Sequence, residues 1–102
     1  MPEHHTEGCG ALIYAKTTNR YLFLLRNKSK HAGSWGIVGG KIESGETVIQ
    51  GLVREIREEI GFLPNIIKSI PLETFVSDDE HFNFQTYVCI VPDEFIPILS
   101  DE

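Results

Sequence analysis

The most informative part of the sequence is GGKIESGETVIQGLVREIREEIGF, residues 39–62. It contains five glutamates, three basic residues and five glycines. Glycine adopts turn conformations at little steric cost, so the first part of the stretch can turn sharply and expose backbone carbonyls. The second part repeats apolar residues at helical spacing. The stretch therefore predicts a glycine-rich loop followed by a helix, with carboxylates in both.

The helix is expected from Thr47 to Ile60, with Gly61 in the left-handed conformation that closes many helices. At about 100° per residue, its apolar residues form one stripe, and such a stripe packs on a sheet. The stripe consists of Val48, Leu52, Ile56 and Ile60, widened by Ile49 and Val53.

Three glutamates stand beside this stripe, because Glu55, Glu58 and Glu59 follow the spacing i, i+3 and i+4. They are expected to converge at the border between buried and exposed surface. Like charges at this spacing destabilise a helix by roughly a few tenths of a kcal/mol per pair, which Arg54 and Arg57 can partly offset. One interpretation is therefore a solvated helix face with ion pairs.

The preceding loop supports a second interpretation, a metal site. Glu43 and Glu46 add carboxylate oxygens beside Gly39, Gly40 and Gly45. Hard cations such as Mg²⁺ bind carboxylates, a carbonyl and retained waters in a near-octahedral arrangement. The loop and the helix could together supply these ligands.

The remaining sequence predicts strands. Residues 10–15 and 21–25 are expected to form a hairpin, and a short strand is expected in 35–40. Two longer strands, 66–77 and 81–92, flank a turn, and Pro71 marks a bulge or a sheet edge in the first of them. The chain is thus predicted to form a sheet covered by one helix.

Composition and charge exclude several classes of protein. The 102 residues predict one domain, and no apolar run approaches the roughly 18 residues of a membrane span. A net charge of -6 argues against electrostatic binding of a nucleic-acid duplex, although a bound divalent cation would let an acidic site accept a polyphosphate. The N-terminus lacks a secretory signal, so we expect a cytoplasmic protein. Cys9 and Cys89 are expected to be buried, reduced thiols.

The stretch also resembles the signature of the Nudix hydrolase family. That signature requires Gly, five residues, Glu, seven residues, and then Arg-Glu-apolar-any-Glu-Glu-any-Gly-apolar, and residues 40–62 meet every fixed position. The position before the double glycine, where many members have Pro, is Val38 here. The matching positions are Gly40, Glu46, Arg54, Glu55, Ile56, Glu58, Glu59, Gly61 and Phe62.

The resemblance implies a single Nudix domain over residues 1–102, with the fold class α/β: an α/β/α sandwich around a mixed sheet, containing a loop-helix-loop catalytic motif. It also implies MutT-like hydrolysis of a nucleoside diphosphate linked to another moiety, with Mg²⁺ or Mn²⁺ as cofactor. Family domains normally continue into another strand and a helix that covers the second face of the sheet. We therefore expect a C-terminally truncated domain with an exposed apolar face. A second copy of the chain could cover that face, so a homodimer is possible.

The resemblance assigns roles to residues of the signature. Glu55, Glu58 and Glu59 would bind the metal with the carbonyl of Gly39, while Glu46 and Arg54 would hold the loop against the helix. Glu58 or Glu55 would act as the general base. Several members recruit the base from a later loop instead, and Glu102, in the terminal acidic segment, resembles that loop and is also a candidate metal ligand.

Three other residues are candidates for substrate binding. The fork of Arg26 suits phosphate oxygens, although a surface ion pair is the alternative. Lys41 is expected on an exposed turn within reach of a phosphate. Trp35 either packs in the core, which we favour, or lines the substrate pocket.

The identity of the substrate does not follow from the signature, because specificity lies in other loops. A nucleoside triphosphate or nucleotide sugar is preferred, because the chain is short. The alternatives to an enzyme are a non-catalytic nucleotide-binding or regulatory module and a structural acidic domain without metal. Modules that lack the chemistry are expected to lack a helix glutamate, and all three are present here.

Overall fold

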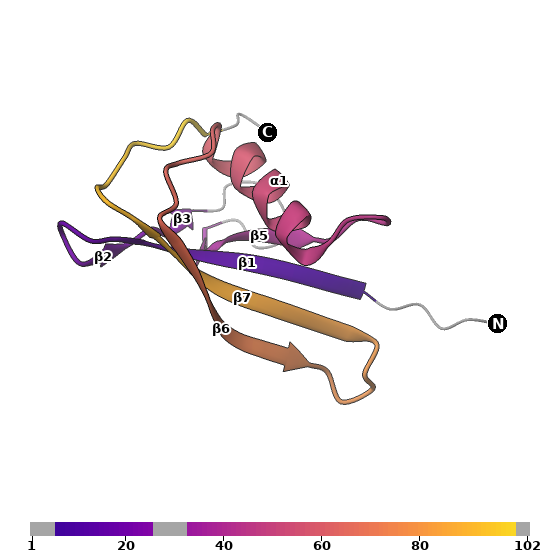
Figure 1. The fold of residues 1–102 in the computed structure, drawn as a ribbon. Helices are drawn as coiled ribbons and strands as arrows, with labels where there is room; N and C mark the ends of the chain where they lie inside the picture. The colour runs from indigo at the N-terminus through magenta and orange to yellow at the C-terminus, as the bar shows by residue number, and fades with distance from the viewer. Residues whose placement is uncertain (1–5, 26–32, 100–102) are drawn as a thin grey trace.

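The computed structural model describes residues 6–25 and 33–99, which form one sheet, a separate two-stranded ribbon and one helix. Figure 1 shows the helix lying across the sheet. In chain order the elements are β1 (Thr6–Ala15), β2 (Arg20–Tyr21), β3 (Leu24–Leu25), β4 (Trp35–Gly36), β5 (Val38–Lys41), α1 (Val48–Ile60), β6 (Lys68–Val76) and β7 (Phe82–Val91).

The sheet is mixed, as predicted. β1 and β7 run parallel at its centre, and β6 pairs antiparallel with β7 at one edge. On its other side, β1 pairs antiparallel with both β5 and β2, at opposite ends of the strand. Cys9 of β1 lies opposite Gly40 of β5, while Ala15 lies opposite Arg20. The loop before α1 is thereby fixed to the centre of the sheet.

Two predicted strands are each divided in the structure. Residues 21–25 form the end of β2 and then β3, and residues 35–40 form β4 and part of β5. The reason is that β5 and β2 compete for the same edge of β1. Because β5 pairs with β1 from Gly8 to Ala11, only the end of β1 is left to pair with β2. β3 and β4 therefore pair with each other, and Leu25 lies opposite Trp35 in a ribbon outside the main sheet.

Helix α1 begins and ends as predicted. The hydroxyl of Thr47 accepts a hydrogen bond from the Gln50 amide (3.1 Å), and the Gln50 side chain accepts one from the Thr47 amide (2.9 Å). This reciprocal pair is a capping box, which satisfies two amides that have no partner within the helix. At the other end, Gly61 has φ 96°, a left-handed conformation.

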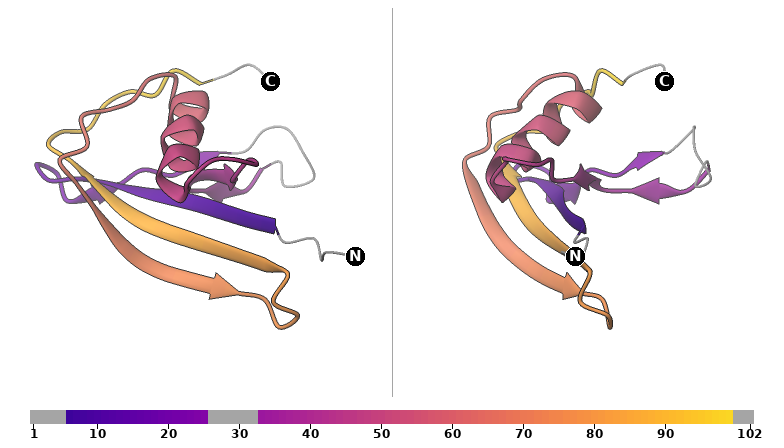
Figure 2. Two further views of the ribbon diagram at one scale, coloured as in Figure 1. Left: turned by 45° about the vertical axis from the view of Figure 1, so that its right-hand side comes forward. Right: turned by 90° about the vertical axis from the view of Figure 1, so that its right-hand side faces the viewer.

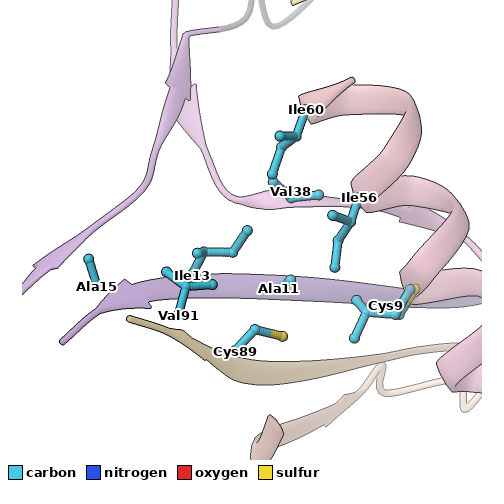
Figure 3. Packing of buried hydrophobic residues seen from close by; sticks show 10 residues of the cluster. Cys9, Ala11, Ile13, Ala15, Val38, Ile56, Ile60, Cys89 and Val91 are labelled. Carbon is cyan, nitrogen blue, oxygen red and sulfur yellow. The ribbon is translucent and has the colours of Figure 1, made fainter. Parts of the chain in front are cut away.

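The core lies between α1 and the sheet (Figure 3). Alternate residues of β1 and β7 point toward the helix, and Ile56 and Ile60 pack on them. Cys9 and Cys89 are buried free thiols, as predicted. The predicted stripe is too wide, because Ile49 is 49% exposed. The helix contacts β5 and β1, and its buried apolar residues are Leu52, Ile56 and Ile60.

The opposite face of the sheet carries no helix among the described residues. Figure 2 shows α1 on one side only, so the described chain forms the sheet and one helical layer of the implied sandwich. Strand β6 is an edge strand with all nine residues exposed. Its register shifts between Pro71 and Glu73, which agrees with the prediction that Pro71 marks a bulge or a sheet edge. The described part of the chain contains no helix long and apolar enough to cross a membrane.

The packing of α1 yields a test of the fold. Ile56 is 1% exposed and Ile49 is 49% exposed on the same helix. We expect Ile56→Ala to lower the free energy of unfolding by about 2–5 kcal/mol, because it leaves a cavity between the helix and the sheet. Ile49→Ala should cost about 1 kcal/mol or less. Urea denaturation measures both, and equal losses would contradict the observed helix orientation.

Candidate functional site

Arg54 joins the loop to the helix. Its Nε and Nη2 donate to the two carboxylate oxygens of Glu46 at 2.7 and 3.0 Å, a two-pronged contact that fixes orientation as well as charge. Glu46 also accepts a hydrogen bond from the Glu43 amide at 2.9 Å. The structure thus places Glu46 and Arg54 in the contact that the resemblance implied, between the turn of the loop and the middle of α1.

The same guanidinium reaches further groups. Nη2 donates to the carbonyl of Lys41 at 2.8 Å, at the end of β5. Nη1 donates to Glu55 at 3.0 Å and to Glu58 at 3.4 Å, and it lies 3.8 Å from Glu43. One cation therefore contacts four carboxylates and one carbonyl. This arrangement offsets the repulsion among carboxylates crowded around one helix.

The contacts of Arg54 affect two pKa values. Its hydrogen bonds hold the pKa of the Glu46 carboxyl below the usual value, and the Glu43 amide adds to the effect. In turn, the hydrogen bond to Glu46 raises the pKa of Arg54 further above its usual value. Both groups therefore stay charged at neutral pH.

The glycine pair allows Glu55 to lie against the strand. A Cβ atom at Gly40 would overlap the Glu55 carboxylate, and a Cβ at Gly39 would overlap the carbonyl oxygen of Cys9. Only glycine therefore lets the helix glutamate lie on β5 while β5 pairs closely with β1. The Glu55 side chain is only 13% exposed as a result.

The three helix glutamates do not converge on one point, contrary to the prediction. No three His, Cys, Asp or Glu side chains within residues 6–25 and 33–99 are arranged as a ready-made metal site. Glu55 and Glu58 both contact Nη1 of Arg54, whereas Glu59 accepts a hydrogen bond from the Gly39 amide at 3.3 Å. The helical spacing sets where the side chains start, but Glu55 and Glu58 turn toward Arg54 whereas Glu59 contacts the Gly39 amide.

The donor set nevertheless fits a hard divalent cation. Glu55, Glu58 and Glu59 supply carboxylate oxygens beside the backbone of Gly39, and Mg²⁺ and Mn²⁺ prefer such ligands. The contacts of Glu58 and Glu59 are long, at 3.4 and 3.3 Å, and the Glu58 side chain is 57% exposed. Of the three glutamates, Glu58 is therefore the one most open to solvent.

The predicted substrate-binding residues have different outcomes. Lys41 is exposed, as predicted, but it is the last residue of strand β5 and not part of a turn. Trp35 is 67% exposed, so the favoured packing in the core is wrong. It lies on the ribbon outside the main sheet, where no described layer covers it. Arg26 and Glu102 lie outside the described residues.

Cys9 is a residue of the site that the sequence interpretation missed. It is buried opposite Gly40, the glycine against which the Glu55 carboxylate lies. Burial raises the pKa of its thiol to about 11, and the negative charge of Glu55 adds to this effect. Cys9 therefore stays a neutral apolar support. In the sequence, Cys9 stands between two glycines in an alternating strand, and this pattern could have indicated a tightly packed position.

Comparison with known proteins agrees with this architecture. The family model of the NUDIX domain matches residues 4–102. The chain is 33% identical to a dihydroneopterin triphosphate diphosphatase of Haemophilus influenzae, over 88% of this chain and 65% of that protein. It is also 33% identical to an 8-oxo-dGTP diphosphatase of Proteus vulgaris, over 76% of this chain and 69% of that protein.

A solved structure shows the same fold. A MutT/nudix family protein from Enterococcus faecalis superposes with a TM-score of 0.78 at 21% identity, over 99% of this chain and 42% of that one. The chain thus spans between 42% and 69% of the length of these three proteins. Because the family model matches nearly all of the sequence, the chain belongs to the Nudix family.

Proposed function

We propose that the protein hydrolyses the pyrophosphate linkage of a nucleoside diphosphate derivative with the help of a divalent cation. The observation that carries the proposal is the network in which Arg54 holds Glu46 of the loop beside Glu55 and Glu58 of the helix. The intact set of helix glutamates favours an enzyme over a non-catalytic module. Two relatives that match most of this chain are named as diphosphatases, which supports the same reaction class.

The cation would be held by the chain's own oxygens. Glu55, Glu58 and Glu59 would provide carboxylates, and Gly39 would provide its carbonyl. Nudix hydrolases generally use divalent metal ions, and Mg²⁺ or Mn²⁺ suits these donors. When bound, such a cation supplies charge neutralisation on phosphate oxygens and lowers the pKa of water.

The structure supports Glu58 over Glu55 as the general base. Glu58 is 57% exposed and has one long contact with Arg54, so it can reach a water molecule and accept its proton. Glu55 is 13% exposed, lies against Gly40 and pairs with Arg54 at 3.0 Å. Glu55 would therefore serve as a metal ligand only, whereas the exposed Glu58 could also accept the proton.

The exposed groups near the loop indicate where substrate would bind. Lys41 is exposed at the end of β5 and would contact phosphate. The exposed ring of Trp35 is available to stack on a base. The diphosphatases of H. influenzae and P. vulgaris are both named for triphosphates, so we favour a nucleoside triphosphate over a nucleotide sugar. Arg26 and Glu102, a cytoplasmic location and a homodimer stay predictions from the sequence.

The general base is tested by Glu58→Gln, which keeps the size of the side chain but cannot accept a proton. Across a panel of nucleoside triphosphates and nucleotide sugars with Mg²⁺, we expect turnover that EDTA abolishes. Glu58→Gln should lower kcat by a factor of about 10²–10⁴. Glu73→Gln, on the exposed edge strand, is the matched control and should retain full activity. Unchanged turnover in Glu58→Gln would remove Glu58 from the reaction.

The pKa of Glu46 yields a prediction about pH. Because its pKa is lower in the folded protein than in the unfolded chain, its ionised form stabilises the fold above the unfolded pKa of about 4.3. That contribution is lost as the pH falls through the folded pKa. Glu46→Gln should therefore lower Tm at pH 7, and its difference from wild type should shrink below about pH 4.3. A difference that does not depend on pH would show that the carboxylate charge is not what stabilises the loop.

A further inference from the structure

The C-terminal end of α1 is closed by a residue outside the Nudix signature. The last carbonyls of a helix have no partner within it. Here the carbonyl of Arg57 accepts the Gly61 amide at 2.9 Å, and the carbonyl of Ile60 accepts the Ile98 amide at 2.7 Å. The segment after β7, residues 92–99, therefore returns to the helix, and Figure 2 shows it reaching that end. We call residues 92–99 the return segment.

The return segment touches the helix end closely. A Cβ atom at Gly61 would lie 2.7 Å from the carbonyl oxygen of Ile98 and 2.8 Å from its Cβ, so the contact requires glycine. Beside it, the rings of Phe62 and Phe95 meet edge-to-face with centroids 5.3 Å apart. Both rings pack against the buried core. Polar and apolar contacts thus fix the return segment at one place.

The fixed end of the helix carries two of the proposed metal ligands. Glu58 and Glu59 lie in the last turn of α1, directly before the fully buried Ile60. One turn earlier on the same helix, Arg54 ties α1 to Glu46 of the loop. The last turn has a second support in the Ile98 amide, which contacts the residue after Glu59.

We propose that Ile98 is a positioning residue, whose backbone holds the last turn of α1 and thereby sets where Glu58 and Glu59 stand. Its side chain is 66% exposed, so Ile98 contributes little buried area of its own. What it contributes is one hydrogen bond and a close backbone contact at the ligand-bearing turn. This inference rests on the proposed function in one respect, the assignment of Glu58 and Glu59 as metal ligands.

The test separates the backbone contact from the side chain. Ile98→Pro removes the amide that binds Ile60, whereas Ile98→Ala keeps it. In Ile98→Pro we expect faster hydrogen exchange at the Gly39 amide, which donates to Glu59. The Glu43 amide, which donates to Glu46 in the loop, should exchange as in wild type and serves as internal reference. Mn²⁺ binding, measured by electron paramagnetic resonance, should weaken about tenfold. Ile98→Ala should match wild type in all three.

A second pair of variants tests the positioning role even if Ile98→Pro does not fold. Gly61→Ala places a methyl group against Ile98, whereas Gly33→Ala, at a similar φ of 89°, meets no described atom within 4 Å. Of these two variants, only Gly61→Ala should speed hydrogen exchange at the Gly39 amide and weaken Mn²⁺ binding. Unchanged Gly39 exchange in a folded Ile98→Pro or Gly61→Ala protein overturns the positioning role. A changed Gly39 amide in a protein that neither binds Mn²⁺ nor turns over nucleotides would instead refute the proposed function.

Discussion

The arrangement of the site depends on one guanidinium. Arg54 projects from the middle of α1 and contacts Glu43, Glu46, Glu55 and Glu58, together with the end of β5. The four pairs differ in exposure, because those with Glu43 and Glu58 are open to solvent, which screens them, whereas Glu46 and Glu55 are mostly buried. Their joint effect is geometric, since the planar fork of arginine binds two oxygens of Glu46 and still has donors for others. The loop, the strand and the helix are thereby held at one point, and the carboxylates of the proposed metal site have fixed starting positions.

Close packing beneath this network makes it possible. The Glu55 carboxylate lies directly on Gly40, which pairs with the buried Cys9 of the central strand. Small or fully buried residues of the sheet therefore lie directly beneath the charged residues of the site. Ile56 and Ile60, on the same helix, anchor that layer to the core. A helix held at one face by apolar contacts and at its border by Arg54 has little freedom to rotate, which is what a set of metal ligands requires.

Local sequence patterns predicted the features that are local in origin. The helix limits, the cap at Gly61, the bulge near Pro71 and the two long strands depend on neighbouring residues. The division of residues 21–25 did not follow from the sequence, because it arises from competition with β5 for the edge of β1. Helical spacing also placed the three glutamates correctly on the helix but not their carboxylates, whose directions depend on Arg54 and the Gly39 amide. The exposure of Trp35 and the contact of Ile98 with Ile60 likewise depend on residues distant in the chain.

The most direct measurement is Mn²⁺ affinity and nucleotide turnover in Arg54→Lys, which keeps the positive charge but removes the planar fork. Lysine cannot bind both oxygens of Glu46 while contacting Glu55 and the Lys41 carbonyl, as arginine does. We expect a folded protein in which Mn²⁺ binding and turnover both fall by about tenfold or more. Wild-type affinity and turnover in Arg54→Lys would show that charge alone suffices and that the arrangement of carboxylates does not depend on the geometry of the guanidinium.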